Sequence, residues 1–195
     1  MDEVEAVVVG AGVIGLAVAR ALALRGHEVV VLERAATIGS ETSSRNSEVI
    51  HGGLYYPQGS LKAVTCVEGR ERLYAYCHDH HVPHAQLGKL IVATSEDEIP
   101  GVAKIEAAAR ANGVDNLEWL SASQAQRLEP ELSCVAALLS PSTGIIDSHA
   151  LMLAYRGEAE AEGAMIAFRA PVVSGRVHAD GFELAVGGDT PTTIR

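Results

Sequence analysis

The sequence has few cysteines, little positive charge and no basic leader. Its 195 residues include three cysteines (Cys66, Cys77 and Cys134), which cannot all pair with one another and lack metal-ligand spacing. Fifteen Lys and Arg against 25 Asp and Glu give a net charge of −10, which argues against nucleic acid and anionic membranes as partners. Acidic residues at positions 2, 3 and 5 replace the basic start of a secretory signal. We therefore expect a protein of a reducing compartment, the cytoplasm.

The most apolar stretch, residues 6–24, is better explained as a strand, a turn and a helix than as a membrane span. It contains Arg20, and its glycines Gly10, Gly12 and Gly15 have G-x-G-x-x-G spacing directly after an apolar run. Residues 14–25 have the periodicity of a helix, and residues 28–33 form a second β-branched run. The pattern predicts a dinucleotide-binding βαβ unit and no transmembrane segment.

Each part of this motif has a physical role. Gly10 is expected to make the tight turn, Gly12 to let a pyrophosphate approach the backbone, and Gly15 to let helix and strand pack closely. The helix N-terminus, at Val13 and Ile14, then faces the phosphates. Glu33 ends the second strand, 21 residues after Gly12, where a carboxylate accepts hydrogen bonds from ribose hydroxyls.

The rest of the chain alternates between helical and strand patterns. We expect helices at residues 60–81, 95–112, 121–128 and 148–162, strands at 89–94, 135–140 and 165–168, and a hairpin of 172–178 with 182–186. In the helix at 60–81, the candidate core positions are Leu61, Val64, Val67, Leu73 and Tyr76, and the run 70–72 is a solvent-facing charged patch. The strand at 165–168 follows a helix, as a third parallel strand should.

Beyond the second strand, the chain resembles a known family of flavoenzymes. Residues 33–34 (ER) and 39–47 (GSETSSRNS) resemble the flavin-binding region of the D-amino-acid oxidase/glycine oxidase superfamily. The resemblance is closer to the L-2-hydroxyglutarate oxidase/dehydrogenase family at residues 45–57 (RNSEVIHGGLYYP), 59–63 (GSLKA), 66–69 (CVEG), 88–94 (GKLIVAT) and 144–148 (GIIDS). Members of that family are longer, so the resemblance covers their N-terminal part.

This resemblance implies FAD as the cofactor and an α/β fold of two alternating domains. Residues 1–86 and 143–195 would form a Rossmann-like FAD-binding domain with a parallel sheet. Residues 87–142 would be part of a substrate domain with an antiparallel sheet. The family's longer chains supply the rest of both domains.

The resemblance also implies a set of flavin-binding residues. The loop after Glu33 would supply donors to the pyrophosphate or the isoalloxazine ring, and the residues concerned are Arg34, Thr42, Ser43, Arg45, Asn46 and Ser47. The alternative is an ordinary polar loop with a helix cap. Val172, after the third strand, would touch the adenine through its backbone.

His51 is expected to lie near the flavin. An imidazole there is a candidate general base for a substrate hydroxyl, and the alternative is a histidine that only positions the ring. Gly53, Tyr55 and Tyr56 would line the substrate cavity, although the tyrosines could equally pack against a sheet. Lys62 and Arg45 are candidate counter-charges for a carboxylate. A cluster of histidines at 78, 80, 81 and 84 lacks a metal-site pattern, so we expect no metal.

These features predict an FAD-dependent oxidoreductase that converts a 2-hydroxy acid such as L-2-hydroxyglutarate into the 2-oxo acid by hydride transfer to flavin. Oxygen or a quinone would accept the electrons, in the cytoplasm or at the periphery of the inner membrane. Two alternatives remain: an amine oxidase of the glycine or sarcosine type, and a truncated, non-catalytic flavin-binding fragment.

Overall fold

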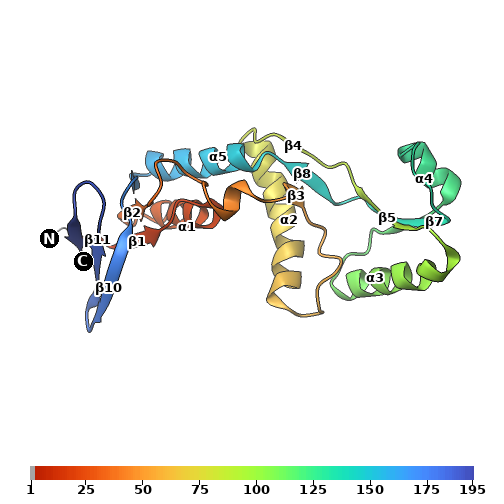
Figure 1. The fold of residues 1–195 in the computed structure, drawn as a ribbon, viewed down its shortest axis with the longest axis horizontal. Helices are drawn as coiled ribbons and strands as arrows, with labels where there is room; N and C mark the ends of the chain where they lie inside the picture. The colour runs from red at the N-terminus through yellow and green to blue at the C-terminus, as the bar shows by residue number, and fades with distance from the viewer. Residues whose placement is uncertain (1–2) are drawn as a thin grey trace. The chain divides into compact units, whose positions relative to one another are not determined.

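The computed structural model describes residues 3–195, so Asp2, used in the argument against a secretory signal, lies outside it. By its contacts, the chain divides into two compact units (Figure 1). The first unit comprises the chain up to Ser47 together with Asp147–Arg195, and the second unit is Glu48–Ile146. The expected boundaries were at 86/87 and 142/143, whereas residues 48–86 and 143–146 pack with the second unit. Which unit serves flavin and which serves substrate stays a prediction.

A three-stranded parallel sheet is the centre of the first unit. Its order is β1 (Ala6–Val9), β2 (Val29–Leu32) and β9 (Met165–Ala167), so the predicted third parallel strand is confirmed. Alternate side chains face opposite sides. One side packs on α1 (Val13–Ala23) and α5 (Ser148–Ala161), and an ion pair of 2.7 Å joins Arg20 to Glu158 across these helices.

The other side of the parallel sheet packs on an antiparallel meander. Its strands are β10 (Val172–His178), β11 (Gly181–Val186) and β12 (Thr192–Ile194), which confirms the predicted hairpin. Val7, Val30 and Leu32 meet Val186 and Ile194 there. Apolar residues on both sides explain why β1 and β2 are nearly continuous valine runs.

Gly15 fixes how closely α1 approaches β1. A Cβ at this position would lie 1.9 Å from the carbonyl oxygen of Gly10. Gly10 itself has φ +99, a conformation that glycine adopts without steric cost. Both predicted glycine roles therefore have a geometric basis in the turn.

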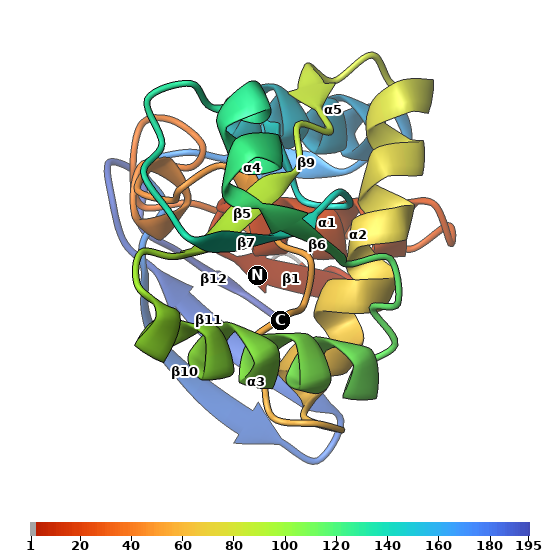
Figure 2. The ribbon, with the colours of Figure 1, turned by 90° about the vertical axis from the view of Figure 1, so that its right-hand side faces the viewer.

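The second unit has two small antiparallel sheets and three helices. One sheet has the order β3 (Val49–Ile50), β8 (Gly144–Ile146), β4 (His84–Ala85), and the other β5 (Lys89–Ala93), β7 (Ala136–Ser140), β6 (Glu118–Ser121). The helices are α2 (Leu61–Asp79), α3 (Ile99–Ala111) and α4 (Ala122–Leu128), with short 3₁₀ turns η2 (Glu96–Glu98) here and η1 (Thr42–Ser44) in the first unit. In Figure 2, α3 lies beside the second sheet, and Val102, Ala109 and Leu138 belong to one core cluster. The α/β fold class with parallel and antiparallel sheets is confirmed.

The orientation of α2 differs from the prediction. Leu61 and Val64, expected in the core, are 80% and 45% exposed, whereas Ala63 and Cys77 are buried. The buried stripe runs through positions 63, 67, 70, 74 and 77, at the three- and four-residue spacing of one helix face. The predicted core position Val67 lies on this stripe and packs against the core, so the prediction is wrong for Leu61 and Val64. Apolar periodicity does not indicate Arg70 and Tyr74, which share the stripe.

No helix in residues 3–195 combines the length and the apolar character that crossing a membrane requires. All three cysteines are free thiols.

We predict that Gly15→Ala lowers the free energy of unfolding by at least about 2 kcal/mol, because the new methyl group collides with backbone that cannot move without opening the β1–α1 turn. Chemical denaturation followed by circular dichroism measures this change. The control is Gly157→Ala in α5, where a Cβ meets open space and helix propensity predicts stabilisation of about 0.5–1 kcal/mol. Equal effects of the two substitutions would contradict the packing role of Gly15.

Candidate functional site

The carboxylate of Glu33 holds the β1–α1 turn against the end of β2. Its Oε2 accepts the N–H of Ala11 at 2.7 Å, and its Oε1 accepts the N–H of Ala35 at 2.8 Å. The residue is only 7% exposed. Each carboxylate oxygen has a second lone pair, so Glu33 can still accept a hydrogen bond from a ribose hydroxyl. The residue therefore organises the turn and keeps the capacity for its predicted contact.

The N-terminus of α1 meets a serine from the following loop. The N–H of Val13 donates to the Oγ of Ser43 at 3.0 Å, and a Cβ at Gly12 would lie 3.0 Å from the same oxygen. Gly12 has no side chain to cap the helix. A positive helix end lined by backbone N–H groups and a hydroxyl suits a pyrophosphate. These residues fit the phosphate part of FAD.

The loop after β2 is attached to the same turn. The N–H of Gly39 donates to Ala11 O at 3.0 Å, and the Nδ2 of Asn46 donates to Ser43 O at 2.8 Å. Arg34 instead forms an exposed ion pair with Glu41 at 2.6 Å. The remaining predicted residues are placed as follows: Thr42 begins η1, Arg45 and Ser47 are exposed beside it, Ile14 is exposed on α1, and Val172 begins β10 and packs under the sheet. Their contacts with flavin stay predictions.

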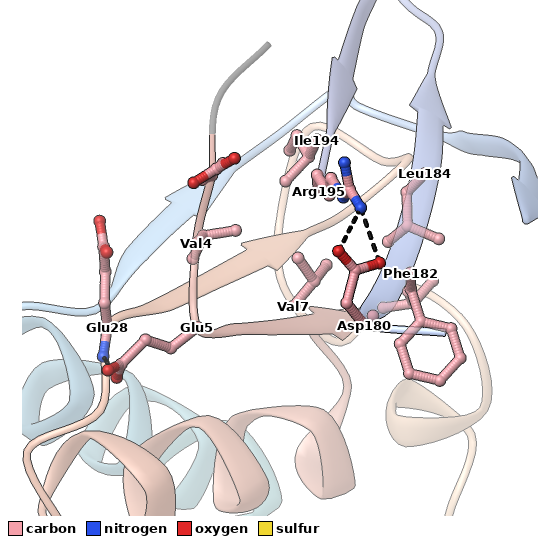
Figure 3. A pocket seen from close by; sticks show the side chains of 12 residues that line it. Val4, Glu5, Val7, Glu28, Asp180, Phe182, Leu184, Ile194 and Arg195 are labelled. Atoms are coloured by element: carbon pink, nitrogen blue, oxygen red, sulfur yellow. Dashed lines mark hydrogen bonds and ion pairs between the residues drawn. The ribbon is translucent and has the colours of Figure 1, made fainter. Parts of the chain in front are cut away.

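A hollow of the first unit lies along β1, and none of the predicted flavin residues line it. It measures about 790 Å³, and Val7, Val9 and Leu184 are among the residues that line it (Figure 3). Figure 3 shows Arg195 facing Asp180, with its Nη2 2.6 and 2.7 Å from the two carboxylate oxygens. Hydrogen bonds from Arg195 lower the pKa of Asp180. The rim is otherwise acidic, with Glu3, Glu5 and Glu28, so the hollow is poorly suited to an anionic cofactor.

In the second unit, the predicted substrate residues meet around one small cavity. Its volume is about 10 Å³, roughly the room for one water. The lining residues are His51, Gly52, Gly53, Leu54, Tyr55, Tyr56, Lys89 and Thr143. The structure thus brings His51, Gly53 and the two tyrosines together. Sequence reasoning missed Lys89 and Thr143, which arrive from β5 and from the turn before β8.

Two lysines face the tyrosines of this cavity. The Nζ of Lys62 lies 4.6 Å from the ring centroid of Tyr56, and the Nζ of Lys89 lies 4.7 Å from that of Tyr55. These are cation–π distances. Desolvation by surrounding protein lowers the pKa of His51, although its side chain is partly exposed, and the charges of Lys89 and Lys62 lower it further. Both effects favour the neutral form of the His51 imidazole over the charged form.

The phenol of Tyr56 also stays neutral. Burial raises its pKa, and the neighbouring Cys66 thiol raises it further. The cavity therefore combines the imidazole of His51, the phenol of Tyr56 and the amine of Lys89, while Lys62 faces the Tyr56 ring. Such a set can accept a proton at His51 while the positive charges attract an anion.

Arg70 supports the segment that carries His51. Its Nη1 donates to Gly52 O at 3.1 Å and to Ser142 Oγ at 3.0 Å, and its side chain is 10% exposed. Tyr74 donates to Ser142 O at 3.2 Å from the same helix face. The expected solvent-facing role of the run 70–72 is therefore wrong for Arg70. The guanidinium can be buried there because it donates to the carbonyl of Gly52, which lies outside the strands and has no partner in a sheet.

Two glycines, Gly52 and Gly53, pack tightly in the segment that Arg70 holds. A Cβ at Gly52 would lie 3.2 Å from both Ser140 Oγ and Thr143 Oγ1. Gly53 has φ +86, and its Cβ would lie 2.9 Å from a methyl group of Val67. Packing against α2 and the β7–β8 turn therefore requires small residues here, whether or not a ligand approaches.

The histidine cluster at the end of α2 is occupied by local contacts. His78 contacts Asp79, His80 stacks on Tyr76 at 3.9 Å between ring centroids, and His84 contacts Val82 O. In residues 3–195, no group of three or more potential ligands is arranged to hold a metal ion.

A βαβ unit with this glycine turn and a carboxylate at the end of β2 defines a dinucleotide-binding protein. The chain belongs to the DAO family, described as FAD dependent oxidoreductase, whose family model matches residues 5–195.

Named relatives and solved structures agree with this membership. The chain is 47% identical over 194 aligned positions to the mitochondrial L-2-hydroxyglutarate dehydrogenase of Arabidopsis thaliana, covering 90% of this chain and 40% of that protein. It is 36% identical to the Homo sapiens protein of the same name over 82% of this chain and 35% of that protein. The chain thus spans two fifths or less of these curated relatives.

Among solved structures, FAD-bound L-alpha-glycerophosphate oxidase from Mycoplasma pneumoniae superimposes with a TM-score of 0.89 at 25% identity. The match covers all of this chain and 53% of that one. Glycine oxidase from Geobacillus kaustophilus shares the fold, with a TM-score of 0.86 at 24% identity and coverage of 100% and 53%.

We predict that Arg70→Met lowers the free energy of unfolding by about 2–3 kcal/mol, because Gly52 O and Ser142 Oγ lose a charged donor in a poorly hydrated place. The imidazole resonances of His51 should shift in the same variant. The control is Arg72→Met on the same helix, where the side chain is 83% exposed and the expected change is within about 0.5 kcal/mol. Equal stability of both variants would contradict the supporting role of Arg70.

We also predict that NMR titration of His51 gives a pKa below its usual value of 6.5. Lys62→Met combined with Lys89→Met should raise this pKa towards 6.5, because two positive charges that oppose protonation are removed. Lys104→Met, on an exposed position of α3, should leave it unchanged. A His51 pKa unaffected by the double substitution would mean that the lysines lie too far away to act on the ring.

Proposed function

We propose that the first unit binds FAD through the β1–α1 turn. The support is the combination of a glycine at the N-cap of α1, the Val13 N–H beside Ser43 Oγ, and the buried carboxylate of Glu33. In the proposed complex, the pyrophosphate lies at the N-terminus of α1 and the ribose donates to Glu33. Arg34, Thr42, Arg45, Asn46, Ser47 and Val172 are the further proposed flavin contacts.

We propose that the protein oxidises a 2-hydroxy acid of the L-2-hydroxyglutarate type to the 2-oxo acid. The named relatives support this substrate, and the observation that carries the chemistry is the position of His51 beside Tyr55, Tyr56 and Lys89 in one cavity. When bound, FAD supplies the hydride acceptor for C2 of the substrate.

His51 is the proposed base in this reaction. Its pKa lies below 6.5, so a free nitrogen is present at neutral pH to accept the proton of the C2 hydroxyl group. Arg70 holds the adjacent Gly52 carbonyl, which limits movement of the segment. Tyr55 and Tyr56 line the same cavity and are the proposed substrate contacts beside His51.

Oxygen or a quinone is the proposed electron acceptor. The relatives above are named as mitochondrial proteins. The cytoplasm or the periphery of the inner membrane is the proposed location of this one.

The proposal predicts flavin retention and its reduction by substrate. Purified protein mixed with FAD and freed of excess should keep the visible flavin bands, and anaerobic L-2-hydroxyglutarate should bleach them. Glycine and sarcosine should not. Bleaching by an amine instead would identify an amine oxidase, bands that never bleach would indicate a non-catalytic flavin binder, and loss of FAD would contradict binding by this chain.

A variant tests the base directly. His51→Asn should retain FAD, because the β1–α1 turn is unchanged, but should slow flavin reduction by L-2-hydroxyglutarate by about 10²- to 10⁴-fold. Stopped-flow absorbance measures the rate. His149→Asn, on the exposed start of α5, is the matched control and should keep the wild-type rate. A normal rate in the His51 variant would assign proton removal to another group.

A further inference from the structure

Lysine is rare in this chain, and its placement is uneven. The 195 residues include three lysines, Lys62, Lys89 and Lys104. Two of them act on the same imidazole, that of His51, although they are 27 residues apart in sequence. The geometry agrees, because Lys89 lines the cavity that contains His51 and Lys62 faces Tyr56 of the same cavity, in a protein whose net charge is −10.

The two lysines come from separate elements and are each held by an aromatic ring. Lys62 lies in the first turn of α2 and faces Tyr56, whereas Lys89 begins β5 and faces Tyr55. A ring face attracts an ammonium group but accepts its protons only weakly. Each Nζ thus keeps N–H groups for an oxygen ligand.

No carboxylate of the protein neutralises this pair. In residues 3–195, neither Lys62 nor Lys89 forms an ion pair, while the arginines at 20, 34, 70, 72, 110, 156, 176 and 195 do. Like charges placed together repel each other, and they also hold His51 in its neutral form. An anion bound by both lysines would relieve this repulsion.

We propose that Lys62 and Lys89 form a binding subsite for a short dicarboxylate and select dicarboxylates over monocarboxylates. This inference rests on the proposed oxidation of a 2-hydroxy acid and names the residues that choose its substrate. The two separate ammonium groups match two carboxylates. His51, on which both lysines act, is left to contact the uncharged part of the ligand.

The test uses glutarate and pentanoate, which have five carbons each and differ by one carboxylate. Their binding to the protein is followed by the His51 resonances at neutral pH and low ionic strength, where the imidazole is uncharged. Glutarate should bind about threefold to fivefold more tightly than pentanoate. Lys62→Met and Lys89→Met should each weaken glutarate binding about threefold to fivefold and remove the preference when combined.

Matched variants separate charge from structure. Lys62→Arg and Lys89→Arg keep the charge and should keep the preference for glutarate, whereas Lys104→Met should bind both ligands as the wild type does. Thermal unfolding of each variant verifies that it is folded. The proposal is overturned by equal affinity for the two ligands, by unchanged glutarate binding in the double Met variant, or by the absence of a saturable shift at His51.

These readouts are independent of flavin. Selective glutarate binding without flavin reduction by L-2-hydroxyglutarate would leave the dicarboxylate subsite in place and reject the proposed oxidation. Reduction of flavin with no effect of the lysines on binding would reject the subsite and keep the oxidation.

Discussion

The first unit depends on the missing side chain at Gly15. Its Cα approaches Gly10 so closely that a methyl group would lie 1.9 Å from a backbone oxygen. This contact lets α1 begin directly after the turn that follows β1. The N-terminus of the helix therefore lies at the carboxyl end of that strand. The face of α1 that packs on α5 and on the parallel sheet follows from the same approach. A larger residue would displace the helix and with it the anion-binding end.

Polar contacts across the sequence turn this packing into a site. Glu33 joins the end of β2 to the turn, and Ser43 adds a hydroxyl at the first N–H of the helix. The buried carboxylate is stable there because two backbone N–H groups donate to it. Glu33 and Ser43 thus hold the turn in place and also offer oxygen atoms to a ligand.

In the second unit, electrostatics and support come from different residues. Arg70 donates hydrogen bonds to Gly52 O and Ser142 Oγ, so its guanidinium holds the segment that carries His51. Lys62 and Lys89 face aromatic rings instead, so their charge remains available to an anion. This difference separates the side chain that supports the segment from the side chains that could attract an anion.

Local sequence patterns determined the βαβ unit, the parallel third strand and the hairpin, because glycine spacing and hydrophobic periodicity act over short distances. They could not orient α2, since its buried stripe contains Arg70 and Tyr74, nor reveal the short strands β3, β4, β6 and β8. The sequence did not indicate Lys89 either, because it lies 34 residues from Tyr55, whose ring it faces only in the folded chain. The sequence by itself determined the class of cofactor-binding turn, and only the tertiary structure decided which charges are satisfied and which remain free, since that depends on contacts between distant segments.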